Sequence, residues 1–147
     1  MDRSAVQRWV GGYERVWRTA GTERLGELFS SGVSYLPSPW ARAVEGLDEL
    51  ARLWDAEREG PDEEFTFRSD VVAVDGDTAV VRVLVDYGGA SSSRWRDLWV
   101  LRFTADGRCE AFEEWPFTPG QHDGREPREE VRSRVGGDRR PEGLKGG

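Results

Sequence analysis

The sequence predicts an α+β domain in which helices pack on one face of an antiparallel sheet. Two observations point to this class. Before about residue 60, apolar residues recur every three or four positions, which is the spacing of a helix with one buried face. After that point they alternate with polar residues in runs separated by turn sequences, as in the strands of a half-buried sheet. Helices followed by a series of strands are typical of α+β domains.

Three helices are expected in the first part of the chain. The first is expected to continue to Gly21, although Gly11 and Gly12 weaken it by about 1 kcal/mol each relative to alanine. Its buried face consists of Val6, Trp9, Val10, Tyr13, Trp17 and Ala20.

The second helix is expected to be short, with Thr22 as its cap and its end at residues 31–32. An extended piece over residues 33–36 separates it from a third helix, which runs from Leu47 to about Arg58. The buried faces contain Leu25, Leu28 and Phe29 in the second helix and Leu47, Leu50, Ala51 and Trp54 in the third.

Four long strands account for the rest of the domain. Asp75-Gly76-Asp77 and Asp106-Gly107 are turn sequences of hairpins, and residues 88–93 form a looser turn between the two hairpins. The strands that these turns separate are expected at residues 65–74, 78–87, 94–104 and 108–117. Because side chains alternate along a strand, one face of each run can be assigned to the interior.

Composition excludes several classes of function. The net charge is −7, whereas nucleic-acid binders usually carry a basic surplus. One histidine and one cysteine are too few for a zinc or iron–sulfur site, and no glycine-rich phosphate-binding motif occurs, so we expect no metal and no cofactor. The apolar stretches are too short to span a membrane and no secretory leader is evident, so we expect a cytoplasmic protein. Nearly all basic residues are arginine, which suggests a GC-rich, bacterial gene.

The chain is expected to divide into a domain over residues 1–119 and a tail over residues 120–147. The tail has no aromatic residue, seven glycines and a charge of +1, from seven basic and six acidic residues. Such a segment cannot bury enough apolar surface to offset the loss of conformational entropy, so we expect it to be disordered. The domain contains all seven tryptophans, so its interior is expected to be strongly aromatic.

Asp97 is the most informative residue of the sequence. It shares a strand face with Trp95, Trp99, Leu101 and Phe103, so it is an acid on a face that is otherwise apolar. Burying a carboxylate is costly unless it is paired, hydrogen-bonded or protonated. Two interpretations remain open: Asp97 lies near the strand end in contact with water or an arginine, or it is a pocket acid with a raised pKa.

Three stretches together resemble a known superfamily: YERVWRTAGTERLGELFSSGVSYLP, GLDELARLW and RDLWVLRFTADGRCEAFEEW. Their order and spacing, over roughly residues 5–117, are similar to the nuclear transport factor 2-like superfamily, which includes SnoaL-like polyketide cyclases, ketosteroid isomerases, scytalone dehydratase and limonene epoxide hydrolase. The resemblance implies a cystatin-like cone, with three N-terminal helices packed on a curved antiparallel sheet of four long strands plus one short strand. The fold hosts many functions, so the activity has to be argued from the site.

The resemblance implies roles at individual positions. Tyr13 falls where the isomerases place an oxyanion-stabilising tyrosine, whereas Leu36 falls at their general-base aspartate, which argues against their mechanism. Their protonated aspartate falls at Trp99, two residues after Asp97 and therefore on the same strand face. Further pocket-facing positions of the family match Trp54, Phe112 and Glu114.

The candidate site therefore combines acids with aromatic side chains. The candidate catalytic residues are Asp97, Tyr13 and Glu114, and a bulge in the last strand would put Glu113 in the place of Glu114. The candidate substrate-binding residues are Trp17, Tyr35, Trp40, Trp54, Phe67, Val85, Trp99 and Phe112. For Tyr13 and for each tryptophan, a place in the core is the alternative interpretation.

Two functions stay open. The first is a cofactor-independent enzyme that isomerises, cyclises or dehydrates a hydrophobic ringed substrate; Asp97 moves a proton, Tyr13 stabilises negative charge and Glu114 is the partner acid or base. Epoxide opening fits the same chemistry. The second is a non-catalytic module that binds an apolar or cationic ligand between tryptophan faces and an acid. The resemblance also implies a homodimer formed through the outer sheet face, whose arginines and aspartates predict an interface rich in ion pairs.

Overall fold

The computed structural model describes residues 1–58, 63–89 and 93–121. The elements in these ranges are α1 (Arg3–Trp17), α2 (Leu25–Leu28), β1 (Phe29–Leu36), β2 (Val44–Glu45), α3 (Leu47–Glu57), β3 (Phe65–Asp75), β4 (Thr78–Tyr87), β5 (Arg94–Phe103) and β6 (Cys109–Phe117). Helices thus precede the four long strands, and the predicted α+β class is confirmed.

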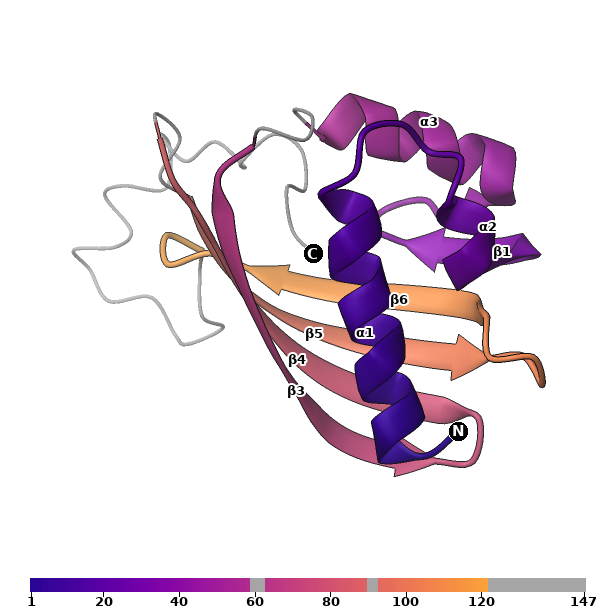
Figure 1. The fold of residues 1–147 in the computed structure, drawn as a ribbon. Helices are drawn as coiled ribbons and strands as arrows, with labels where there is room; N and C mark the ends of the chain where they lie inside the picture. The colour runs from indigo at the N-terminus through magenta and orange to yellow at the C-terminus, as the bar shows by residue number, and fades with distance from the viewer. Residues whose placement is uncertain (59–62, 90–92, 122–147) are drawn as a thin grey trace.

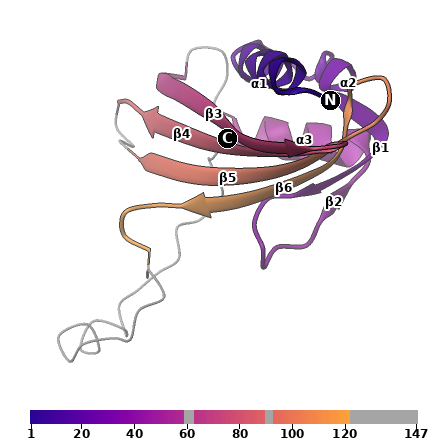
Figure 2. The same ribbon diagram turned by 90° about the horizontal axis from the view of Figure 1, so that it is seen from below.

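The six strands form one curved sheet in the order β2-β1-β6-β5-β4-β3. In Figure 1, α1 runs across the concave side of the sheet, and α3 lies next to β1 at one end of the cone. Seen from below in Figure 2, β3 to β6 curve beneath α1. The sheet differs from the prediction in two details: β2 is an additional strand of two residues, and β1 pairs with β6 in parallel, whereas the other pairs are antiparallel.

β1 is longer than the predicted extended piece. It begins at Phe29, which is fully buried and pairs with Cys109 of β6. Residues 31–32 were predicted to end a helix, but they lie in β1 between Phe29 and Ser34, where the register of the pairing shifts. A polar Ser-Gly pair here marks an irregularity inside a strand and not the boundary of an element.

α1 ends at Trp17, four residues before the predicted end. The buried guanidinium of Arg58, which follows α3, donates hydrogen bonds to main-chain oxygens at this end and in the next turn. The acceptors are the carbonyl oxygens of Val16, Trp17, Thr19 and Gly21, at 2.6 to 3.4 Å. Helix ends leave carbonyl groups unpaired, so one arginine satisfies this end and ties α1 to α3. The predicted Thr22 cap is not formed, because α2 starts after Arg24 without a side-chain cap.

The core lies between α1 and the inner face of the sheet. The predicted parity is confirmed in β4 and β5, where the inward side chains are buried; they are Val81, Val83, Val85, Trp95, Asp97, Trp99, Leu101 and Phe103. None of the helices within residues 1–58, 63–89 and 93–121 is both long and apolar enough to cross a bilayer. Residues 122–147, most of the predicted tail, lie outside the described residues, so the tail stays a prediction.

Candidate active site

Two acids from neighbouring strands meet inside the cone. Asp97 lies on β5 and Glu114 on β6, and the register pairs Trp99 with Glu114 and Asp97 with Pro116. The two acids are therefore diagonal neighbours on one face of the sheet, within reach of each other. Both face inward, because Asp97 is 2% exposed and Glu114 is 1% exposed. The interpretation of Asp97 as a solvated strand-end residue is thus wrong.

The register also decides between the adjacent glutamates of β6. The pairing of β5 with β6 shifts only next to Cys109, before either glutamate, so the alternation continues undisturbed to the end of the strand. Glu113 therefore points outward, where its Oε2 accepts a hydrogen bond from the indole Nε1 of Trp115 at 2.6 Å. Glu114 is the inward acid, as the sequence predicted.

Burial controls the ionisation of the carboxyl pair. Loss of water raises the pKa of Glu114 well above its usual range, and the neighbouring Asp97 raises it further. Burial also raises the pKa of Asp97, but the hydrogen bond with Glu114 and the backbone N–H of Phe117 act in the opposite direction. Within the pair, Glu114 is therefore the more readily protonated acid, and Asp97 is the better base.

Within the described residues, neither acid forms an ion pair with a cation. Both oxygens of Asp97 and Oε2 of Glu114 are buried without a hydrogen bond of standard geometry from the rest of the described chain. Buried polar groups are normally satisfied, so these oxygens retain capacity to interact with a bound group.

Two tyrosines extend the polar interior. Tyr13 comes from α1 and Tyr35 from β1, and both hydroxyls are fully enclosed, which raises their pKa values well above the ordinary range. Each hydroxyl influences the pKa of the other, and Glu114 raises both. At neutral pH both tyrosines are therefore neutral hydroxyl donors beside the carboxyl pair.

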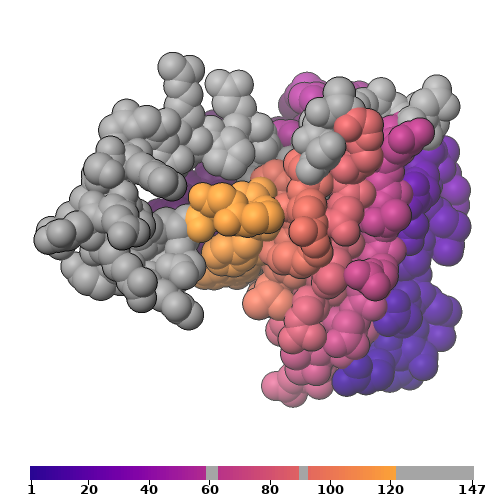
Figure 3. All heavy atoms as spheres, turned by 90° about the vertical axis from the view of Figure 1, so that its left-hand side faces the viewer, coloured from indigo at the N-terminus to yellow at the C-terminus, as the bar shows by residue number. Residues whose placement is uncertain are grey.

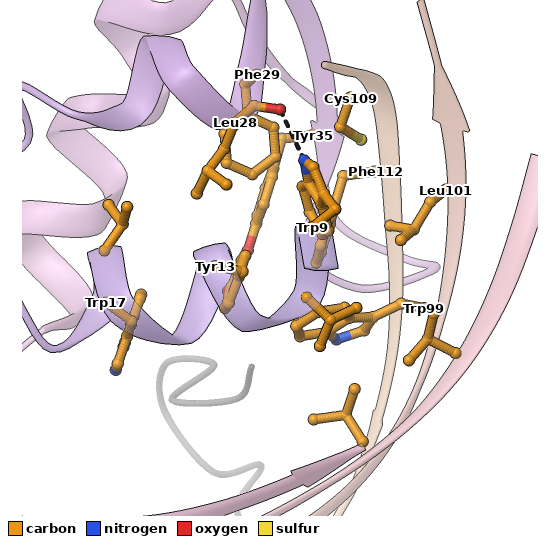
Figure 4. Close-up of a cluster of buried hydrophobic side chains, with 14 of the residues drawn as sticks. Trp9, Tyr13, Trp17, Leu28, Phe29, Tyr35, Trp99, Leu101, Cys109 and Phe112 are labelled. Atoms are coloured by element: carbon orange, nitrogen blue, oxygen red, sulfur yellow. Dashed lines mark hydrogen bonds between the residues drawn. The ribbon is translucent and has the colours of Figure 1, made fainter. Parts of the chain in front are cut away.

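Aromatic rings pack closely around these groups. The ring centroid of Tyr13 lies 4.6 Å from that of Trp99, and Tyr35 stacks on Phe112 at 4.4 Å. Figure 4 shows Tyr13 on α1 facing Tyr35, with Trp99 and Phe112 on the sheet side of the cluster. Phe67 completes this packing from β3, 6.0 Å from Trp99. The rings fill the interior densely and exclude water from it.

Access from the surface is narrow. The cavity next to Glu114 has a volume of about 10 Å³, which is room for about one water molecule. It is lined by Trp17, Tyr35, Pro37, Leu53, Trp54, Glu57 and Glu114. A ringed molecule would therefore reach the acids only if the chain around Pro37 and the end of α3 moved apart.

The predicted substrate-binding residues fall into three groups. Trp17, Tyr35 and Trp54 line the cavity. The buried residues Trp99, Phe112 and Val85, together with the partly buried Phe67, pack in the interior without lining it. Trp40 was predicted to line the pocket, and this is wrong: its side chain is 91% exposed, because the Pro-Ser-Pro connector carries it away from the interior.

Sequence reasoning missed three residues of the cavity wall. Pro37 was read only as part of a rigid connector, and Leu53 and Glu57 of α3 were not considered. Glu57 lies three residues after Trp54, on the same face of the helix, so extending the predicted apolar face by one turn would have found it.

The structure also shows the surroundings of the cysteine and of the potential metal ligands. Cys109 is buried, and burial raises the pKa of its thiol to about 12, so it behaves as a small apolar residue as in an ordinary core. Among the described ranges, no three side chains of histidine, cysteine, aspartate and glutamate lie close enough together to hold a metal ion.

Residues 6–112 match the SnoaL-like domain family, and this match spans most of the chain. The chain belongs to the SnoaL-like domain family. This confirms the resemblance drawn from the three sequence stretches. No curated protein matches the chain.

Solved structures show the same fold at low sequence identity. SalBIII, an epoxide hydrolase/cyclase-like enzyme in pyran ring formation in the polyether salinomycin, aligns with a TM-score of 0.63 and 15% identity over 79% of this chain and 93% of SalBIII. A steroid delta-isomerase from Pseudomonas aeruginosa aligns with a TM-score of 0.56 and 18% identity over 80% and 82%. A protein with a cystatin-like fold from Silicibacter pomeroyi gives 0.56 and 14% over 74% and 73%. These likenesses establish the cystatin-like fold of this SnoaL-like chain and leave its activity to be argued from the site.

Proposed function

We propose that this SnoaL-like protein is a cofactor-independent enzyme that isomerises or cyclises a hydrophobic, oxygen-bearing ring substrate by acid–base chemistry. The observation that carries the proposal is the buried pair of Asp97 and Glu114, two acids that share one interior and form no ion pair within the described residues. Unpaired buried acids reduce the stability of a fold, so they are concentrated at functional sites.

The pair provides an acid and a base side by side. Asp97, as the ionised partner, would take a proton from a hydroxyl or an acidic carbon of the substrate. Glu114, as the protonated partner, would give a proton to the oxygen of an epoxide or carbonyl group, and Tyr13 would stabilise charge on that oxygen by hydrogen bonding. Transfer of the proton from Asp97 back to Glu114 then restores the starting state, so no redox partner is required.

Ring closure is the favoured version of this chemistry. Attack of a hydroxyl on an epoxide needs one group to remove the hydroxyl proton and another to protonate the leaving oxygen, and the Asp97–Glu114 pair supplies both. The fold shared with SalBIII supports this choice. A mechanism with a general base at the Leu36 position is not available, because this side chain has no titratable group.

Two measurements test the proposal. Turnover of a panel of epoxy alcohols and enones would be followed by mass spectrometry for the wild type, Asp97→Asn, Glu114→Gln and the matched control Glu113→Gln. We expect losses of at least about 100-fold for the first two variants and little change for Glu113→Gln. Infrared spectra at neutral pH should show a protonated carboxyl band that disappears only in Glu114→Gln. Full turnover by Asp97→Asn would contradict the proposal.

The lining of the cavity favours a second candidate, a binding module for a cationic ligand. Trp17 and Trp54 stand beside the acids Glu57 and Glu114, and an ammonium group is stabilised by tryptophan faces and a carboxylate. Titration with hydrophobic amines would separate the two functions. Tight binding that Glu57→Gln weakens, without turnover of any panel substrate, would favour the binding module.

We also propose a homodimer formed through the outer sheet face. Figure 3 shows the strands from β3 in pink to β6 in orange on this side of the molecule. Leu98, Trp115 and Phe117 are 40 to 48% exposed there, and Leu98 pairs directly with Trp115. Most arginines of this face already pair within the chain, as Arg82 does with Asp70, so apolar contacts would carry the interface instead of the predicted ion pairs. Sedimentation should show a dimer that Trp115→Arg dissociates; a monomer of the wild type at micromolar concentration would contradict it.

A further inference from the structure

A second hollow lies along α1, beside its buried face and apart from the cavity next to Glu114. This groove, of about 320 Å³, runs between α1, α2 and the turn that connects β5 with β6. In Figure 1, α2 and this turn lie on the right-hand side of α1. Of the residues that line the groove, Trp9, Val16 and Leu28 also belong to the buried core, and none lines the cavity beside Glu114.

The rim of the groove is cationic. Arg8 and Arg15 are seven residues apart on α1, which is two helical turns, so both side chains lie on the face that borders the groove. Neither forms an ion pair with an acid of the described residues, whereas Arg24 on the other side pairs with Glu27 at 2.7 Å. In a chain with a net charge of −7, two unpaired arginines beside one groove form a local site of positive potential.

The floor of the groove is apolar. Trp9, Val16 and Leu28 contribute carbon as narrow strips, since these side chains are only 3 to 6% exposed, and the indole Nε1 of Trp9 donates to the carbonyl oxygen of Leu28 at 2.9 Å. Figure 4 shows this hydrogen bond. An apolar floor below a cationic rim matches a ligand with a hydrocarbon part and a negatively charged head.

The two glycines in the middle of α1 fit this groove. A Cβ atom at Gly12 would lie 3.1 Å from Cδ2 of Leu28 in the floor, and one at Gly11 would lie 3.4 Å from Nη1 of Arg15 on the rim. Each glycine costs helix stability, about 1 kcal/mol relative to alanine. Because neither residue has a Cβ atom, the Leu28 side chain can pack close to α1 and the Arg15 guanidinium can lie along the helix.

We propose that this groove is a second binding site, which takes an amphipathic small-molecule anion, a carboxylate or phosphate with a hydrocarbon body. Arg8 and Arg15 hold the anionic head, and Trp9, Val16 and Leu28 contact the hydrocarbon. The site is independent of the carboxyl pair, so it stands whether or not the interior is catalytic.

Calorimetric titration of the full chain tests the proposal with four probes: octanoate, octyl phosphate, 1-octanol and inorganic phosphate. We expect octanoate and octyl phosphate to bind at least about 10-fold more tightly than the other two, since only they combine a charge with a hydrocarbon. The tighter of the two identifies the head group. Arg8→Gln and Arg15→Gln should each weaken binding about 5-fold or more, whereas Arg68→Gln on the outer face should not change it.

Nuclear magnetic resonance of the same samples locates the bound probe. Shifts of the Gly12 and Gly107 amides and of the Trp9 indole are expected on addition of octanoate. The proposal is overturned if 1-octanol binds as tightly as octanoate, if Arg68→Gln weakens binding as much as Arg15→Gln, or if no probe binds at millimolar concentration. Binding of the chain to anionic vesicles without binding of free octanoate would also overturn it, because that result indicates a membrane surface.

Discussion

Asp97, on the inner face of the sheet, and Asp86, on its outer face, lie on neighbouring strands and are surrounded in opposite ways. Asp97 is buried, and its carboxyl interacts with a second acid, Glu114. Asp86 lies near solvent, with Nη1 of Arg96 at 3.0 Å and Nε of Arg94 at 3.4 Å. Burial therefore raises the pKa of Asp97, whereas the two arginines lower the pKa of Asp86.

The two faces of the sheet differ in how their acids are paired. On the outer face Asp70, Asp86 and Glu110 each have an arginine beside them, and such exposed pairs contribute little individually. The inner face breaks the rule that buried charges are paired. Apolar side chains at these two inner positions would give a more stable protein, so the acids are better explained by function than by folding.

Replacing one tryptophan on each face should give the largest contrast. Trp99 is fully buried among Tyr13, Phe67 and Phe112, so Trp99→Ala removes many contacts and leaves a cavity. We expect a loss of about 3–5 kcal/mol in the free energy of unfolding. Trp115→Ala, at a position that is 40% exposed, should cost less than about 1 kcal/mol. Urea unfolding of the two variants, at protein concentrations low enough to dissociate the proposed dimer, measures both values; equal losses would contradict the contrast between the two faces.

A buried cation gives a second, smaller contrast with the buried acids. The Arg58 side chain is only 4% exposed, but four carbonyl oxygens of α1 and its following turn accept its hydrogen bonds. Arg58→Met keeps the apolar stem and leaves those carbonyls unpaired, so we expect a loss of about 2–3 kcal/mol. Arg52→Met, at an exposed position of α3, the helix that Arg58 follows, is the control and should change stability by less than about 0.5 kcal/mol. Equal stability of Arg58→Met and the wild type would show that water replaces these bonds.

Much of this contrast between the faces could be predicted from the sequence. Strand alternation placed Asp97 inside, because a period of two is a local property of the chain, whereas the family resemblance selected Glu114 over Glu113. The closeness of the two acids could not be predicted, because it depends on the register between β5 and β6. The position of Trp40 was predicted wrongly for a related reason. The side chain of an aromatic residue beside the first short strand can face the interior or the solvent, and its direction depends on the path of the Pro-Ser-Pro connector.

The residues that act through the backbone were also beyond sequence reasoning. The role of Arg58 could not be predicted from a sequence pattern, because its partners are main-chain carbonyl oxygens, which every residue has. The small volume of the cavity depends on how closely the rings pack, which composition does not fix.

The pH dependence of stability should have opposite signs for the two faces. Glu114 has a raised pKa in the folded protein, so the folded state binds more protons than the unfolded state between about pH 4 and that raised pKa. Stability is therefore highest below about pH 4 for this group and falls as the pH rises towards neutrality. Glu114→Gln cannot ionise, so it should flatten this decline, and each unit of pKa shift corresponds to about 1.4 kcal/mol.

Asp86 should behave in the reverse way, because its arginines lower its pKa in the folded state. Its contribution is present above about pH 4 and is lost as the pH falls through the lowered value. Asp86→Asn should thus reduce stability at neutral pH and leave it unchanged in acid. Thermal unfolding of the wild type, Glu114→Gln, Asp86→Asn and Glu113→Gln between about pH 3 and about pH 8 measures these slopes. If Glu113→Gln flattened the decline as much as Glu114→Gln, the buried acid would not be its source, and the distinction between the two faces would fail.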